Sequence, residues 1–384
     1  MLADTDAGSV ITVAQSGAQW GYRLLLPNLL LIPAMFLAQE VAMRLGLATR
    51  RGTVALVLQN YGRLPAAVLL IALTASCFGA LVSELSGLAG AAQSFGVPTG
   101  IAMAGTVGAL MLIVVTGSYR KVERVALSLG ALELAFLAMA WRASPGLAPI
   151  VREAALIPLR DHGYLYLLAA NLGTSVIPWT LLYQQSASVD KRLEPRHAWA
   201  ARWETLAGVM LCQIITSALL IAAAATLGRG TPLDTVPEIE DAFTATLGIA
   251  VGRIVFVLGL SGGALVATIV VCLTLAWTIG ELLGLRHALE QYPRQAPAFY
   301  GSLCLMLAAA GWLVASGIDQ ISLSIGAGVL NALLLPIVLG FLYALARREA
   351  MGMLCLRGVY AAVVALAFIA TSIAGVYAGV AGLL

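Results

Sequence analysis

Eleven apolar segments follow one another along this chain, separated by short polar gaps. All but the first are long enough to approach the roughly 20 residues that a helix needs to cross the hydrocarbon core of a bilayer. Soluble domains carry about 25% charged residues, whereas this chain has 11%, which excludes the soluble classes. We therefore predict an all-α polytopic membrane protein. The expected helices lie near 9–20, 22–48, 64–95, 98–117, 122–141, 163–186, 203–227, 248–284, 298–316, 321–346 and 358–382.

The positions of lysine and arginine predict an orientation for this layout. Most of the 22 basic residues fall in every second gap, and cytoplasmic loops are the ones enriched in basic residues. The remaining gaps hold only six of them. We therefore expect a multi-pass cell-membrane protein with its N-terminus in the cytoplasm and its C-terminus outside. The six are Arg23, Arg142, Arg152, Arg160, Arg229 and Arg253.

Two short stretches interrupt the helical pattern. Residues 4–9 directly precede the first apolar run, and residues 173–178 lie in the middle of the sixth segment. Pro178 has no N–H to donate and Gly173 loosens the backbone. Such a break is often a simple kink, but broken backbone inside a membrane survives only where it lines a protein cavity. Because the first and sixth helices correspond in a five-plus-five repeat, the pair of breaks favours a transporter binding site.

Asp6 lies at the first of these breaks. A charge at membrane depth is costly and is usually functional. Carboxylate and backbone carbonyl oxygens are hard ligands that suit Mg²⁺, Ca²⁺ or Mn²⁺. The residues therefore point to a divalent cation, with no other cofactor implied.

At these motifs the chain resembles the NRAMP family of divalent-metal transporters. The stretch 6–22, DAGSVITVAQSGAQWGY, resembles the family's first-helix signature, Asp-Pro-Gly-Asn followed by Gln-Ala-Gly-Ala-Gln-Phe-Gly-Tyr. The stretch 173–178, GTSVIP, is similar to the family's Gly-Ala-Thr-Val-Met-Pro. Residues 118–123 resemble the loop before the fifth helix, and residues 238–242 resemble the loop before the eighth.

The resemblance implies a LeuT-like fold in a single transporter domain over 1–384. Its two inverted five-helix repeats would span about 1–142 and 163–346, with an extra helix at about 358–382. Fewer residues precede the aspartate here than in the family, so the first helix is expected to lack its N-terminal half. The resemblance also places the metal between the first and sixth helices. The positions carried over are Asp6, Ser9, Thr174, through its carbonyl, and Ile177.

Departures from the family pattern predict the ion and its coupling. Ile177 replaces a soft methionine thioether, so an oxygen-only site remains, which resembles the magnesium-transporting branch of the superfamily, although Mn²⁺ also accepts oxygen ligands. The sixth helix has Trp179 and Gln184 where the family has histidines. The third helix keeps one acid, Glu84, and the ninth has no arginine. Because a proton relay needs a chain of titratable groups, we expect uptake that is not coupled to protons.

Other polar residues inside the predicted helices have two interpretations each. Gln213 and Asn331 lie where the family has amide ligands or gates, and together with Glu84 and Gln184 they are candidate pathway residues. A plain interhelical hydrogen bond is an equally good explanation for the two amides. Glu40 and Glu133 are either pathway acids or, more commonly, packing residues paired with a neighbour.

Three functions remain open at this stage. The first is transport of a divalent cation, Mg²⁺ or Mn²⁺, by alternating access. The second is a LeuT-like carrier of small organic solutes, which Asp6 disfavours because it would repel a substrate carboxylate. The third is a transport-inactive homologue. No catalytic constellation indicates an enzyme, no basic patch indicates nucleic acid, and the expected partners are the metal ion and the lipid bilayer. The sequence leaves the oligomeric state open.

Overall fold

The computed structural model describes residues 5–116, 128, 131–143, 146–191, 193–227, 230, 232–283 and 297–384. Within these ranges nearly every residue is helical and no strand is present, which confirms the predicted all-α class. The longer helices are α1 (Ala7–Trp20), α2 (Leu25–Thr49), α4 (Arg63–Gln93), α5 (Thr99–Thr116), α9 (His162–Ser175), α10 (Pro178–Asp190), α11 (Ala198–Thr226), α13 (Ile249–Leu283), α14 (Pro297–Ala315), α15 (Gln320–Ala346) and α16 (Gly358–Leu383). The shorter ones are α3 (Thr53–Tyr61), η2 (Ala131–Leu134), α7 (Ala135–Ala143), α8 (Leu147–Ala154), η3 (Pro195–His197), α12 (Val236–Leu247) and η4 (Glu349–Leu354).

Seven spans within the described ranges are long and apolar enough to cross a membrane, counting α9 and α10 as one interrupted span. Two shorter apolar helices accompany them, at Thr99–Leu112 and Tyr300–Ala315. Most predicted segments agree with these helices to within a few residues. The loop predicted at 118–123 and the start of the segment predicted at 122–141 lie outside the described residues.

Three α-helices lie in segments that we predicted to be gaps or loops, namely α3, α8 and α12, and the short 3-10 helices η3 and η4 lie in such gaps as well. The expectation of a loop at 238–242 is wrong, because these residues belong to α12. Pro237 occupies the first turn of that helix, where its missing N–H costs nothing. Ile239 and Phe243, one helical turn apart, are both fully buried, so an apolar face anchors α12 to the bundle.

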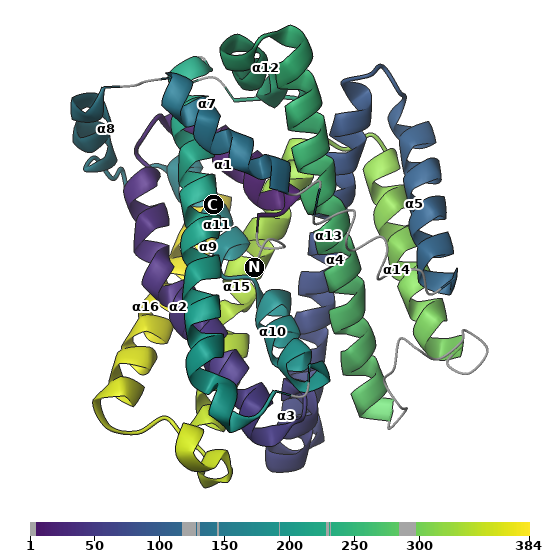
Figure 1. The fold of residues 1–384 in the computed structure, drawn as a ribbon, viewed down its shortest axis with the longest axis vertical. Coiled ribbons are helices and arrows are strands. Elements are labelled where there is room, and N and C mark those ends of the chain that lie inside the picture. Colours follow the sequence, from purple (N-terminus) through teal and green to yellow (C-terminus); the bar gives the residue numbers. More distant parts are fainter. Residues whose placement is uncertain are drawn as a thin grey trace.

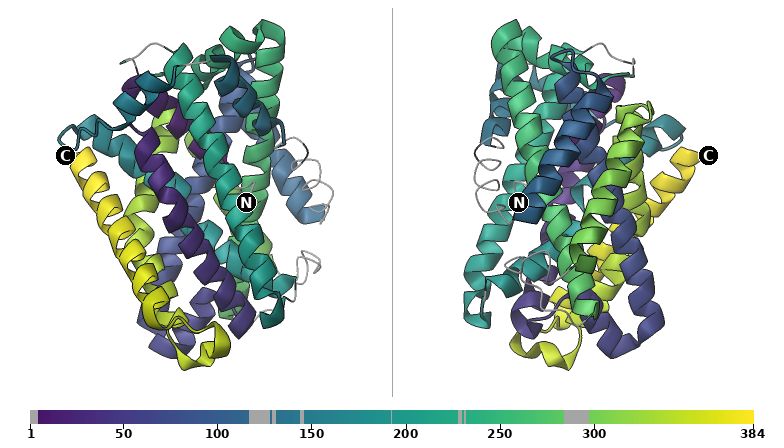
Figure 2. Two further views of the ribbon diagram at one scale, coloured as in Figure 1. Left: turned by 60° about the vertical axis from the view of Figure 1, so that its left-hand side comes forward. Right: turned by 90° about the vertical axis from the view of Figure 1, so that its right-hand side faces the viewer.

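Helix α15 runs through the middle of the bundle and packs against α4 and α9, while α1 packs against α11. Figures 1 and 2 show α5 and α14 side by side on one flank and α16 along the opposite flank. The buried residues form two apolar clusters. One lies among α2, α4, α10 and α13, and the other surrounds α1, α9, α11 and α12. Both α1 and the interrupted span are therefore enclosed by other helices.

The close approach of α9 and α15 depends on glycine. A Cβ built on Gly173 would collide with the carbonyl oxygen of Gly328 and lie 2.6 Å from the backbone nitrogen of Ala332. A Cβ on Gly328 would come within 2.9 Å of the carbonyl oxygen of Ala170. Small residues that allow two backbones to approach are the usual basis of helix packing in membranes.

We predict that Gly173→Ala destabilises the protein by about 1–3 kcal/mol, the usual cost of overpacking a tight contact. The clash is with backbone atoms, which cannot rotate away as a side chain can. Thermal unfolding in detergent measures the effect. Gly105→Ala in α5 is the matched control, because nothing lies within 4 Å of its added Cβ. Equal melting temperatures for the two variants would contradict this account of the α9–α15 contact.

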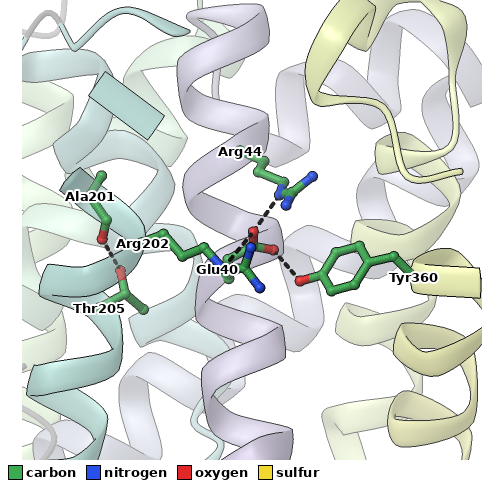
Figure 3. A network of polar contacts seen from close by, with 6 residues as sticks. All are labelled: Glu40, Arg44, Ala201, Arg202, Thr205 and Tyr360. Carbon is green, nitrogen blue, oxygen red and sulfur yellow. Dashed lines mark hydrogen bonds and ion pairs between the residues drawn. The ribbon is translucent and has the colours of Figure 1, made fainter. Parts of the chain in front are cut away.

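A polar network centred on Glu40 joins α2, α11 and α16 (Figure 3). Glu40 is 1% exposed. Its Oε1 lies 2.5 Å from Nε of Arg44 and 3.9 Å from Nε of Arg202, and its Oε2 accepts a 2.8 Å hydrogen bond from the hydroxyl of Tyr360. Both guanidinium groups also lie over the Tyr360 ring, at 5.0 and 5.7 Å from its centroid. These contacts favour the packing interpretation of Glu40 over a role as a pathway acid.

We predict that Glu40→Gln lowers the free energy of unfolding by about 1.5–3 kcal/mol, the range for hydrogen bonds to a charged group. The amide keeps the shape of the side chain but removes the charge that two arginines share. Thermal unfolding in detergent measures the loss, with Glu349→Gln in the exposed turn η4 as control. The interpretation fails if both variants melt together with the wild type.

Candidate metal site

The N-terminus of α1 is built around the side chain of Asp6. This residue is the N-cap, and its Oδ1 accepts a 2.7 Å hydrogen bond from the backbone N–H of Ser9. The Ser9 hydroxyl in turn donates to the backbone carbonyl of Asp6 at 2.9 Å. Both side chains are almost fully buried. An aspartate three residues before a serine at a helix start favours this cap, and the positive end of the helix stabilises the carboxylate.

Helix α4 brings a second carboxyl group to the same place. Oε2 of Glu84 accepts a 3.1 Å hydrogen bond from the backbone N–H of Ala7, and its carboxyl group also interacts with that of Asp6. Glu84 is fully buried, and its Oε1 has no hydrogen-bond partner. Two adjacent carboxyl groups repel each other when both are charged, so the pair favours a cation or a proton between them. The structure thus joins one predicted pathway residue to the predicted metal-binding aspartate.

Gly8 makes room for this arrangement. A Cβ on Gly8 would lie 2.5 Å from the hydroxyl oxygen of Ser83 and 3.5 Å from Oδ1 of Asp6. The Ser83 hydroxyl is buried without a hydrogen-bond partner. Ser83 is a polar neighbour that the sequence analysis missed, although its position directly before Glu84 was visible.

The second break occurs where the sequence predicted it. Helix α9 ends at Ser175, and α10 begins at Pro178 after two non-helical residues, Val176 and Ile177. The N–H that would bond to the carbonyl of Thr174 in a continuous helix belongs to residue 178, and proline has none. The Thr174 carbonyl is therefore released from the helical ladder, as its proposed role as a metal ligand requires.

The other groups at the second break are already engaged. The Thr174 hydroxyl donates within its own helix, to the carbonyls of Ala170 at 3.0 Å and Asn171 at 3.3 Å. The Ile177 carbonyl accepts from the Thr180 hydroxyl at 2.9 Å, and the Ile177 side chain carries no ligand atom. Helix α1 is bonded to α9 through Asn171, whose Nδ2 donates to the Ser16 hydroxyl at 2.7 Å. Asp6 and Ser9 are thus brought together, while ligation by Thr174 and Ile177 stays a prediction.

The three amides proposed for the pathway each link two helices. Nε2 of Gln184 lies 3.4 Å from the Thr205 hydroxyl, and Nε2 of Gln213 lies 3.8 Å from the sulfur of Met35. Oδ1 of Asn331 accepts a 2.6 Å hydrogen bond from the Ser76 hydroxyl, which joins α15 to α4. These contacts fit the interhelical role that was left open for Gln213 and Asn331, and a pathway role for any of the three stays a prediction.

In the part of the chain that the structure describes, no three His, Cys, Asp or Glu side chains are placed to hold a metal ion together. A metal at Asp6 would therefore draw on hydroxyl and backbone carbonyl oxygens, as an oxygen-only site requires. A bundle of apolar helices with buried acidic groups at one helix start and one interrupted span defines a class: membrane proteins with discontinuous helices, the architecture in which secondary transporters bind their ions.

The chain belongs to the Nramp family, because the family model described as natural resistance-associated macrophage protein-like matches residues 1–381. Two similar relatives are both named divalent metal cation transporter MntH. The one from Bradyrhizobium diazoefficiens is 28% identical over 283 residues, covering 69% of this chain and 62% of the relative. The one from Levilactobacillus brevis is 28% identical, and the match covers 57% of this chain and 51% of the relative. The chain thus spans less than two thirds of the length of these relatives.

Solved structures confirm the LeuT-like fold. The manganese transporter of Eremococcus coleocola, crystallised with an aromatic bis-isothiourea compound, has a TM-score of 0.74 at 17% identity and covers 97% of this chain and 83% of its own. MhsT in complex with L-phenylalanine has a TM-score of 0.54 at 12% identity, with 98% of both chains covered.

Proposed function

We propose that this protein takes up a divalent cation, Mg²⁺ or Mn²⁺, across the membrane by alternating access. The observation that carries the proposal is the buried carboxyl pair of Asp6 and Glu84 at the broken start of α1. Two acids placed together inside an apolar bundle are suited to a doubly charged ion. Membership of the Nramp family and the likeness to proteins named divalent metal cation transporters support the choice.

The same pair disfavours an organic solute as the substrate. MhsT, which shares the fold, is described in complex with an amino acid. In carriers of this fold, the N-terminal ends of half-helices hold the substrate carboxylate. Here Asp6 caps that helix end and already accepts the N–H of Ser9. A substrate carboxylate at this place would meet two acidic side chains.

A basic end of the bundle supports the proposed orientation, in which this end faces the cytoplasm. Arg348 lies over the ring of Tyr61 at the end of α3, with 5.3 Å from its Cζ to the ring centroid. Arg51, directly before α3, donates to Oε1 of Gln59 at 2.6 Å. Segments far apart in the sequence therefore gather arginines at one end, and basic ends face the cytoplasm. An inside-negative membrane potential drives a divalent cation into the cell.

We expect Asp6→Ala to reduce Mn²⁺ uptake into proteoliposomes to the level of empty vesicles, because the ion loses one of the two buried carboxyl groups that meet at the start of α1. Excess Mg²⁺ should compete with Mn²⁺ in the wild type. A pH dye inside the same vesicles should report no stoichiometric proton entry. Positions 179 and 184 hold tryptophan and glutamine, so the histidines that a proton relay would use are missing there. Glu349→Gln, an exposed acid, is the control. Full uptake by Asp6→Ala would refute the proposed function, and stoichiometric acidification would refute uncoupled uptake.

We expect Ile177→Met to shift the selectivity toward soft ions. A thioether next to the released Thr174 carbonyl would add a ligand that favours Cd²⁺ over Mg²⁺. The ratio of Cd²⁺ to Mg²⁺ transport rates should rise roughly tenfold, which corresponds to about 1.4 kcal/mol. Ile177→Leu controls for the change in side-chain shape. A ratio that is the same in both variants would place residue 177 away from the ion.

A further inference from the structure

Glu133 is the most isolated acid among the described residues of the bundle. It lies in η2, directly before α7, and is 1% exposed. Neither of its carboxylate oxygens has a hydrogen-bond partner. Within the described ranges, no arginine or lysine forms an ion pair with it. This contrasts with Glu40, which has three partners, so the packing interpretation does not account for Glu133.

The Glu133 carboxylate faces the chain segment that leads into Asp6. A Cβ built on Gly263 of α13 would collide with Oε1 of Glu133 and would also lie 2.8 Å from the carbonyl oxygen of Thr5. Both oxygens therefore border the same small space beside Gly263. Glycine inside a helix costs roughly 1 kcal/mol relative to alanine, and here its missing side chain leaves that space open.

The Glu133 carboxylate and the Thr5 carbonyl are both hydrogen-bond acceptors, and two acceptors repel each other when no donor lies between them. Glu133 is also close enough to Asp6 for their negative charges to interact, and the charge of Glu84 interacts with the charges of both. An isolated carboxylate in an apolar interior is strongly unfavourable unless a counter-charge is supplied. A cation beside Thr5 would satisfy the carbonyl and the carboxylate together, and both are ligands that hard divalent ions accept.

We propose that Glu133 and the Thr5 carbonyl form a second cation position next to Asp6, which holds the transported divalent ion for one step of its passage. This proposal rests on the proposed function. The position is separate from the Asp6–Glu84 pair, because the described acids do not converge on one ion. An ion that leaves Asp6 for this position exchanges one carboxylate for another, so it crosses the apolar interior without losing its counter-charge.

Mn²⁺ uptake and equilibrium Mn²⁺ binding by the purified full chain test the proposal. Glu133→Gln keeps the size of the side chain and removes its charge, so the KM for Mn²⁺ uptake should rise about 10- to 100-fold, as is typical when a group that supports a metal is lost. Glu133→Asp, which keeps the charge, should retain part of the affinity. Glu349→Gln should match the wild type.

Binding separates this inference from the proposed function. We expect Asp6→Ala to retain weak Mn²⁺ binding, and the double variant Asp6→Ala with Glu133→Gln to lose it. If uptake is lost in Asp6→Ala but the KM for Mn²⁺ is unchanged in Glu133→Gln, the second cation position is overturned and the proposed function is left intact. A variant that changes only the pH dependence of uptake would assign Glu133 to proton binding and would also overturn it. If Glu133→Gln does not fold, a wild-type KM in Glu133→Asp counts against the proposal, since the shorter side chain withdraws its oxygens from Thr5.

Discussion

Inside a bilayer every backbone carbonyl must find a partner, because no water is available to provide one. This constraint gives the start of α1 at Asp6 and the interruption between α9 and α10 their meaning. At Thr174 a proline removes the donor one turn ahead, and at Asp6 the chain enters its helix through a side-chain cap. Neither place is exposed to lipid, since two apolar clusters enclose these helices. The rest of the bundle is the scaffold that keeps the capped start of α1 and the released Thr174 carbonyl away from the hydrocarbon.

The sequence predicted the parts of this scaffold that depend on local chemistry. Apolar length located the spans, and Pro178 located the break. Short helices escaped prediction because their signals are weak. Helix α3 has nine residues and ends at Gly62, whose positive φ of 90° ends the helix. Residues 238–242 of helix α12 resemble a loop of the family, so we expected a loop there, but the buried face of these residues makes them helical.

Contacts between segments that are distant in the chain could not be predicted from the sequence alone. Glu84 was recognised as the one acid of its helix, but only the packing of α4 beneath α1 shows that it meets Asp6. Glu40 and Glu133 had the same two interpretations, and their surroundings separate them. Glu40 lies among two arginines and a tyrosine, whereas Glu133 faces a carbonyl and other acids. In each case a partner from another helix decides the role, and the register between helices is set by tertiary packing.

A sulfur atom near the site bears on the choice of ion. The Thr5 hydroxyl donates to Sγ of Cys212 at 3.5 Å, so α11 brings a thiol close to the segment that precedes Asp6. A cysteine binds metal as its thiolate, and the Cys212 sulfur already accepts the Thr5 hydroxyl. This sulfur therefore does not replace the thioether that Ile177 lacks. In the function that we propose, the ion at Asp6 would be held by carboxylate, hydroxyl and carbonyl oxygens, a set that suits hard divalent ions better than the softer transition metals.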